Sequence, residues 1–149
     1  MEKCLILGYW GVGKTTLVKS TEKAVDLTDI TIIPSLDILH QYWADPSYDV
    51  VMADPNWEKV IIKSGIPFYV VIPTPDRLEE FILNFQERYK QGKGGGDLIF
   101  CTLMKGRWKH WLDKYKNGIA CVEVIELPSG QWLKDAIEYI NNRDNYEEH

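Results

Sequence analysis

The stretch GYWGVGKT, Gly8–Thr15, constrains the fold of this 149-residue chain more than any other feature. It matches the pattern G-x-x-x-x-G-K-[ST] at every fixed position. A short apolar run, KCLIL at Lys3–Leu7, precedes it, and a helix-like segment, Thr15–Lys23, follows it. A strand before the pattern and a helix after it are the context in which such a loop binds phosphate. We therefore expect the loop to hold the phosphates of a nucleotide rather than to be a chance glycine turn.

The fixed positions of this motif each have a chemical role. Gly11 and Gly13 allow backbone turns that point successive N–H groups at an anion, and the helix that follows adds its positive end. Lys14 is expected to reach the β- and γ-phosphates, and the Thr15 hydroxyl is expected to bind Mg²⁺. The expected nucleotide-binding residues of the motif and its first helical turn are Gly8, Gly11, Val12, Gly13, Lys14, Thr15 and Thr16.

Strand-like and helix-like segments alternate along the rest of the chain. Most of the strand-like runs are apolar throughout, which is typical of a parallel sheet that helices cover on both faces. The expected strands are residues 3–7, 24–27, 49–53, 67–72 and 120–127, and the expected helices are residues 15–23, 35–43, 55–64, 74–90, 97–115 and 131–142, before a polar tail that should fray. Because no repeat and no linker divides the chain, we expect one α/β domain over residues 1–149.

Composition argues against several classes of protein. The net charge of −5 argues against a broad nucleic-acid-binding surface, although it leaves room for a local basic groove. The three cysteines lie far apart and the three histidines lack metal-ligand spacing, which favours a reducing compartment without a disulfide framework. No segment approaches the ~18 apolar residues of a membrane span. We therefore expect a cytoplasmic protein with no membrane partner.

The segment after the third expected strand separates the classes of nucleotide-binding protein. A GTPase would carry D-x-x-G there and N-K-x-D for guanine, whereas this chain reads DPNW at Asp54–Trp57 and has no N-K-x-D. An ATP-driven motor would usually be longer and would carry Asp-Glu where Asp54 is followed by proline. The short chain, the five strands and a basic segment late in the fold favour a small kinase.

Several further segments carry a resemblance to a known family. They are VDLTD after the first helix, YDVVMAD, GIPFYVVIP, FQERYKQGKGG, RWKHWLDKY and VIELPSGQWLKDAI, in that order. In these segments the chain resembles the short, phage-type P-loop nucleotide kinases that are often labelled adenylate kinase-like, near which the kinases of 5-hydroxymethyluracil in phage DNA belong. The resemblance implies a three-layer P-loop NTPase fold with sheet order 2-3-1-4-5 and a small lid. It also implies ATP and Mg²⁺ as cofactors, and the cytoplasm of an infected bacterial host as the location.

Acidic residues at the ends of two strands are the candidates for proton transfer and metal binding. A kinase must orient its acceptor and neutralise the charge of the moving phosphoryl group. Asp26, at the end of the second strand, is expected to orient or deprotonate an acceptor hydroxyl, with Asp29 as the competing candidate. Asp54, at the end of the third strand, is expected to support Mg²⁺ through water. Both strand-end aspartates can equally serve as helix or loop caps.

A cationic segment that runs into the glycine-rich stretch GKGGG is the candidate lid, over residues 86–97. Arg88 is expected to contact the phosphates on closure, about the hinge that the glycines provide. Lys93 stands where the resembled family has a second arginine, and it is expected to supply charge without arginine's bidentate geometry. The alternative for these cations is a role in the last helical turn, where they complement the helix dipole.

Several aromatic residues and one arginine have two interpretations each. Tyr9 and Trp10 either shield the phosphates or pack on a neighbour, and Arg77 either packs or touches the base. Trp43 and Trp57 lie nearer the expected acceptor region, where either one can stack on a base or belong to the core. The helical stripes predict core positions for Trp108, Trp111 and Trp132.

Three functions are compatible with these residues. The first is a kinase that transfers the γ-phosphate of ATP to a nucleotide or nucleoside-type acceptor, with Lys14, Asp26 and Arg88 as catalytic residues. The second is a kinase for 5-hydroxymethyluracil bases in phage DNA, so that modified DNA would be the partner. The third is a non-catalytic ATP-binding regulatory module. The acceptor, the preference for ATP over GTP and the oligomeric state, monomer or weak dimer, stay open.

Overall fold

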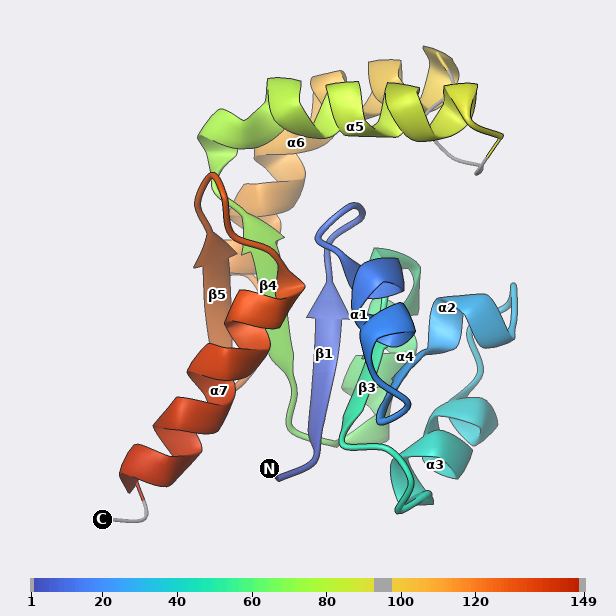
Figure 1. Ribbon diagram of the computed structural model, residues 1–149, viewed down its shortest axis with the longest axis vertical. Helices are drawn as coiled ribbons and strands as arrows, with labels where there is room; N and C mark the ends of the chain where they lie inside the picture. Colours follow the sequence, from blue (N-terminus) through green and yellow to red (C-terminus); the bar gives the residue numbers. More distant parts are fainter. Residues whose placement is uncertain (1, 93–97, 148–149) are drawn as a thin grey trace.

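Five parallel strands form one sheet in the order β2-β3-β1-β4-β5, as the computed structural model, which describes residues 2–92 and 98–147, shows (Figure 1). The strands are β1 (Cys4–Gly8), β2 (Ala24–Asp26), β3 (Val50–Ala53), β4 (Tyr69–Pro73) and β5 (Glu123–Leu127). Every pair of neighbouring strands is parallel. The predicted α/β class, the five strands and the 2-3-1-4-5 order are therefore confirmed.

The sheet is built around β1, which pairs with β3 on one side and with β4 on the other. Leu5 lies opposite Val51, and Leu7 lies opposite Ala53 and Val70. All residues of β1 are buried, and its sequence is accordingly apolar rather than alternating. The glycine-rich motif therefore begins at the end of the central, fully enclosed strand.

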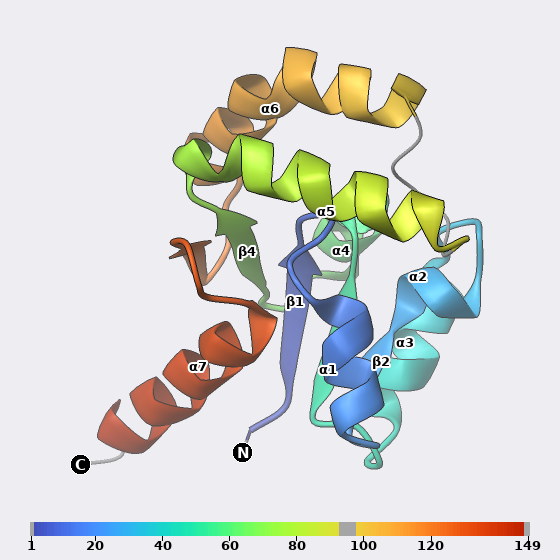
Figure 2. The same ribbon diagram turned by 45° about the horizontal axis from the view of Figure 1, so that its top comes forward.

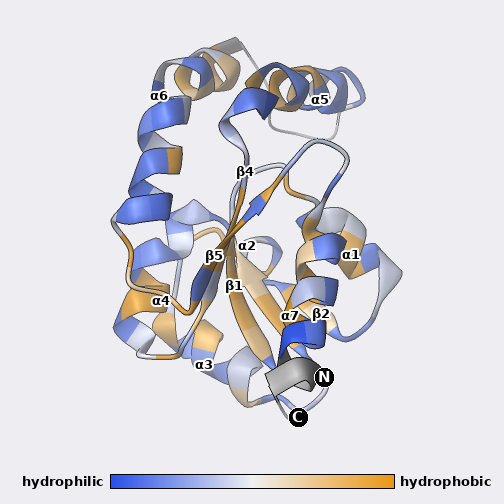
Figure 3. Cartoon of the chain, turned by 90° about the vertical axis from the view of Figure 1, so that its left-hand side faces the viewer, coloured by the Kyte–Doolittle hydropathy of each residue, from blue (hydrophilic) through white to orange (hydrophobic). Residues whose placement is uncertain are grey.

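Helices join the strands and cover both faces of the sheet. They are α1 (Lys14–Ser20), α2 (Leu27–Ile30), α3 (Leu36–Ala44), α4 (Glu58–Ser64), α5 (Leu78–Lys90), α6 (Leu98–Asn117) and α7 (Leu133–Glu147), with 3₁₀ turns at Pro55–Trp57 and Pro75–Arg77 before α4 and α5. Figure 3 shows α1 and α7 on one face of the sheet and α3, α4 and α6 on the other. Helix α5 lies across the carboxyl ends of the strands, above the loop that follows β1 (Figures 1 and 2).

Most element boundaries differ by a few residues from those predicted, as three examples illustrate. The second strand ends at Asp26, and α2 follows at once because the Asp26 carboxylate accepts a hydrogen bond from the Thr28 N–H and caps that helix. Strand β5 begins at Glu123, opposite Tyr69 of β4, rather than at residue 120. Helix α7 continues to Glu147 instead of ending near residue 142, since no glycine or proline interrupts it.

Composition led us to expect no membrane-spanning segment and no disulfide framework. Within the part of the chain that the structure describes, no helix has both the length and the apolar character needed to cross a bilayer. Cys4 and Cys101 are buried thiols, and Cys121 is a half-buried thiol.

Candidate functional site

The loop between β1 and α1 turns at two glycines in left-handed conformations. Gly11 has φ 85° and Gly13 has φ 107°, a region that residues with a Cβ rarely adopt. Gly13 caps α1, and the first helical bond runs from the Leu17 N–H to the Gly13 carbonyl at 3.0 Å. Among the described residues, none accepts a hydrogen bond from the N–H groups of Gly11, Gly13, Lys14, Thr15 and Thr16. These donors are available to an anion.

Lys14 is buried against this loop and contacts its backbone. Its Nζ donates hydrogen bonds to the carbonyl oxygens of Gly8 and Tyr9, both at 3.0 Å. Burial lowers the pKa of Lys14, and the carboxylates of Asp26 and Asp54 oppose that shift. Because charges interact strongly only over short distances, the lysine and the two carboxylates form one charged cluster.

Asp26 and Asp54 lie at the carboxyl ends of adjacent strands. Asp26 Oδ1 accepts a hydrogen bond from the Thr28 N–H at 3.1 Å, and Asp54 Oδ1 accepts one from the Asn56 N–H at 2.9 Å. The Thr28 hydroxyl oxygen accepts a hydrogen bond from the Asp54 N–H at 3.1 Å, so that Thr28 joins the two segments. The capping interpretation is therefore confirmed for both aspartates, while their roles in proton transfer and metal binding stay predictions.

The environments of Asp26 and Asp29 distinguish the two candidates for the acceptor-orienting carboxylate. Asp26 is 5 % exposed, whereas Asp29 is exposed in the first turn of α2. Burial raises the pKa of Asp26, and the neighbouring Lys14 ammonium acts in the opposite direction. A buried carboxylate beside a buried lysine is a common arrangement at functional sites, so the geometry favours Asp26.

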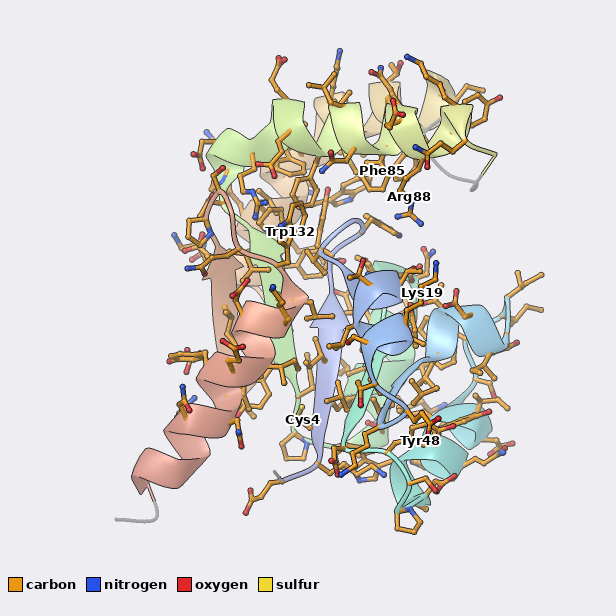
Figure 4. All side chains as sticks on the ribbon, in the orientation of Figure 1. Cys4, Lys19, Tyr48, Phe85, Arg88 and Trp132 are labelled. Atoms are coloured by element: carbon orange, nitrogen blue, oxygen red, sulfur yellow. The ribbon has the colours of Figure 1, made fainter. Side chains whose placement is uncertain are left out.

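A cavity of about 730 Å³ lies between the loop, α1, α5 and the start of α7. Figure 4 shows Phe85 and Arg88 projecting from α5 toward α1, and Trp132 at the end where α7 begins. The residues that line the cavity are Gly11, Gly13, Thr15, Thr16, Leu17, Lys19, Ser20, Phe81, Asn84, Phe85, Glu87, Arg88, Trp132 and Lys134. The cavity thus joins a polar surface on α1 to an aromatic surface formed by α5 and Trp132.

Four of the predicted nucleotide-binding residues line this cavity, namely Gly11, Gly13, Thr15 and Thr16. Arg88, predicted as a catalytic residue, lines it too. The Val12 side chain is fully buried, and the Val12 carbonyl accepts a hydrogen bond from the Leu133 N–H at 2.8 Å. Gly8 and Lys14 are buried behind the loop, where the Lys14 side chain rests on the Gly8 carbonyl. Val12 and Gly8 therefore shape the loop through their backbone.

The predicted lid lies only in part within the described residues. Helix α5 carries Arg88 in its last turn, and the Arg88 charge adds to burial in lowering the pKa of Lys14. Lys93 and most of the glycine-rich stretch fall within residues 93–97, outside the described residues. The structure therefore places Arg88 at the cavity, and the role of Lys93 stays a prediction.

The aromatic wall of the cavity was not assigned by sequence reasoning. Phe81 and Phe85 belong to the apolar stripe of α5, which predicts core positions, and both are buried but also line the cavity. Trp132, predicted for the core, is half-buried at the cavity. Asn84 of α5 also lines the cavity and has no motif around it. One apolar stripe here serves both the core and the cavity.

Trp43 and Trp57, the two tryptophans considered for base stacking, lie where they cannot stack on a ligand in this cavity. Trp57 is 1 % exposed, within the core. The Trp43 ring lies 5.5 Å from Lys3 Nζ, and Lys3 precedes the amino end of β1, whereas the glycine-rich loop follows its carboxyl end. Neither ring can therefore contact a ligand at this cavity.

Tyr9 and Trp10, in the variable positions of the motif, pack on α6. The ring centroids of Tyr9 and Trp108 are 5.5 Å apart, and those of Trp10 and Trp111 are 5.0 Å apart. Of the two interpretations of these residues, packing on a neighbour is the observed one. These contacts attach the loop to the helical hairpin of α5 and α6.

The donors near the loop fit a magnesium ion that is held mainly by phosphate and water. Among residues 2–92 and 98–147, no group of three or more His, Cys, Asp or Glu side chains is placed to bind a metal. Mg²⁺ bound with phosphates needs only one or two protein ligands. Thr15 is an exposed residue that lines the cavity, and Asp54 Oδ2 accepts no hydrogen bond from the described residues. Both groups therefore fit the predicted roles.

Comparisons with protein-family models, with curated proteins and with solved structures found no match in any of the three.

Proposed function

We propose that the chain has a P-loop NTPase fold and is a kinase that transfers the γ-phosphate of ATP, with Mg²⁺, to a nucleotide or nucleoside-type acceptor. The observation that carries this proposal is the row of N–H donors at Gly13–Thr16 beside a cavity of about 730 Å³, next to a buried lysine and two buried carboxylates. That volume lies within the range of about 300–1,000 Å³ that is usual for small-molecule sites.

The donor nucleotide fits the cavity in one direction. Its phosphates fit the loop, where free N–H groups and the amino end of α1 favour negative charge. Its base fits the aromatic surface, because Phe85 and Trp132 offer flat apolar groups on which a base can stack. The γ-phosphate then lies toward Arg88 and the Lys14 cluster.

Lys14 and Arg88 stabilise the charge on the transferred group. The Lys14 ammonium now donates to two neutral carbonyl oxygens, and phosphate oxygens would be stronger acceptors because they are charged. Arg88 approaches from α5 and can bind two phosphate oxygens at once. The Thr15 hydroxyl and, through water, Asp54 would hold a Mg²⁺ ion, which would supply further neutralisation of phosphate charge.

Asp26 orients the acceptor hydroxyl and takes its proton. Because burial raises the pKa of Asp26, the carboxylate is a stronger base than an ordinary aspartate, and Lys14 helps to keep it ionised. The acceptor oxygen forms a bond to the γ-phosphorus while the bond from that phosphorus to the β–γ bridging oxygen breaks. ADP leaves with that electron pair, and the proton stays on Asp26 until solvent removes it.

The test is transfer of labelled phosphate from ATP with Mg²⁺ to monophosphates, nucleosides and DNA with or without hydroxymethyl bases. We expect label on a free nucleotide or nucleoside, and a loss of at least about 100-fold in kcat for Lys14→Met. Lys63→Met is the matched control, because Lys63 is an exposed lysine in the last turn of α4.

The other outcomes of this assay identify the competing functions. If label is retained only in hydroxymethylated DNA, the acceptor is modified DNA rather than a free nucleotide or nucleoside. Tight ATP binding with no transfer to any acceptor would favour a non-catalytic module. Unchanged turnover in Lys14→Met would mean that the activity does not belong to this site.

A further inference from the structure

Arg77, in the 3₁₀ turn before α5, is buried although it does not line the cavity. Its side chain forms a bidentate pair with Glu80, with Nε to Oε1 at 3.0 Å and Nη2 to Oε2 at 2.7 Å. Its Nη1 donates to the carbonyl oxygens of Leu127 at 3.0 Å and Gln131 at 2.9 Å. Arg77 therefore ties the start of α5 to both ends of the loop that follows β5.

The Arg77 guanidinium also lies against two aromatic rings. Its central carbon is 4.6 Å from the Trp132 ring centroid and 5.1 Å from that of Phe81. The two rings are nearly parallel, at 20° with centroids 6.0 Å apart. Both rings line the cavity. The guanidinium thus contacts the aromatic wall from a position outside the cavity.

The segment that Arg77 holds continues directly to the phosphate-binding loop. The residue after Trp132, Leu133, donates its N–H to the Val12 carbonyl at 2.8 Å. A Cβ placed on Gly13 would lie 3.7 Å from the Trp132 Cβ. Trp132 is therefore held on one side by the loop and on the other by Arg77. These two contacts fix the position of its ring in the cavity between α5 and the loop.

We propose that Arg77 is a positioning residue that holds Trp132 as a wall of the site for the base of the nucleotide. This inference rests on the proposed function, and it goes beyond that function by naming the group that couples α5 to the loop after β5. Four hydrogen bonds and two ring contacts fix the guanidinium in one orientation. Loss of Arg77 would let Trp132 tilt, while the N–H donors of the loop would keep their positions.

The experiment compares a ligand that has a base with one that has none. Isothermal titration calorimetry measures the Kd of Mg-ATP and of Mg-tripolyphosphate for the wild type, Arg77→Lys and Glu80→Gln. We expect Arg77→Lys to weaken Mg-ATP binding roughly tenfold, as the loss of one base-stacking contact does. Glu80→Gln should weaken it severalfold, and both should bind tripolyphosphate within about twofold of the wild type. Arg143→Lys, which alters the ion pair between Arg143 of α7 and Glu123 of β5, is the matched control.

A second readout follows Trp132 itself. In protein labelled with 5-fluorotryptophan, the ¹⁹F signal that disappears in Trp132→Phe should shift in Arg77→Lys before any nucleotide is added. If the signal does not move, or if Mg-ATP and tripolyphosphate lose affinity equally, the inference is wrong. Should Arg77→Lys fail to fold, Glu80→Gln decides the matter, because Glu80 is partly exposed. A wild type that does not bind Mg-ATP would instead overturn the proposed function, whether or not it binds tripolyphosphate.

Discussion

Replacing Gly11 with alanine tests whether the loop and α5 are pressed together as the structure shows. The backbone of Gly11 has φ 85°, and an added Cβ would lie 2.8 Å from Phe85 Cζ and 3.3 Å from Phe81 Cδ2. Real Cβ atoms essentially never approach another atom within 3.0 Å, so one partner must move. The Phe85 ring is not free to turn away, because its centroid is 5.1 Å from that of Phe100 and 6.5 Å from that of Phe81.

The expected destabilisation has two parts. A residue with a Cβ in the left-handed region costs roughly 1–2 kcal/mol. Displacing a packed side chain costs a further ~1–3 kcal/mol. Gly11→Ala should therefore lower the free energy of unfolding by about 2–5 kcal/mol. Gly65→Ala isolates the first part, since Gly65 has φ 71° with nothing within 4 Å of an added Cβ.

Urea unfolding, followed by far-UV circular dichroism, measures both variants and the double variant Gly11→Ala with Phe85→Leu. The shorter leucine removes the ring atom that the new methyl meets. The double variant should therefore lose at least ~1 kcal/mol less free energy of unfolding than the two single variants lose in total. Equal destabilisation by Gly11→Ala and Gly65→Ala, together with additive behaviour of the double variant, would refute the close contact between the loop and α5.

Two further predictions concern catalysis. Asp26→Asn should keep the helix cap, because asparagine is an equally good cap, and should lower kcat by about 100-fold or more. Burial raises the pKa of Asp26 above 3.8, so wild-type kcat, which needs the ionised carboxylate, should fall on acidification at a higher pH than an ordinary aspartate titrates. That acid limb should be absent from the residual activity of Asp26→Asn, and its persistence would assign the proton to another group. Arg88→Met should lower kcat at least about tenfold while it changes the free energy of unfolding by less than ~0.5 kcal/mol, since Arg88 is exposed. Arg107→Met, an exposed arginine on α6, is the control, and an equal loss of activity in both variants would remove Arg88 from the site.

The strands could be predicted because each carries its own signal, whereas their order was an implication of the family resemblance. Continuous apolar runs predicted parallel strands, and Gly65 in a left-handed conformation ends α4 at the residue where the sequence placed that end. Helix α2 was missed because Leu27, the first residue of that helix, follows the short strand Ala24–Asp26 and was assigned to it. The decisive feature was the hydrogen bond from the Thr28 N–H to the Asp26 side chain, and a local apolar pattern contains no information about that bond.

Two parts of the candidate site differ in how far the sequence predicts them. We call the β1–α1 loop with Lys14 and Asp26 the floor, and the α5 residues that line the cavity the roof. The floor was predictable and the roof was not. The spacing of glycines, lysine and threonine in the motif specifies the loop without reference to distant residues. The roof depends on where α5 crosses the sheet, which is set by contacts such as the hydrogen bond from Trp108 Nε1 to the Pro75 carbonyl at 2.8 Å. Phe85 and Asn84 become cavity residues only through that placement, because a helical stripe does not reveal which neighbour it will meet.

This difference between floor and roof has a measurable consequence for substitutions. Gly11 and Asp26 take part in tight packing or in a helix cap, and Lys14 is buried with two hydrogen bonds to the loop. Disruptive changes at these floor positions remove native contacts as well as chemical groups, so they should lower stability and activity together. Arg88 makes no comparable contact, since it is an exposed side chain that reaches over the cavity from α5. Its removal should therefore lower activity alone, and that contrast separates a group that acts on the ligand from groups that also hold the loop in place.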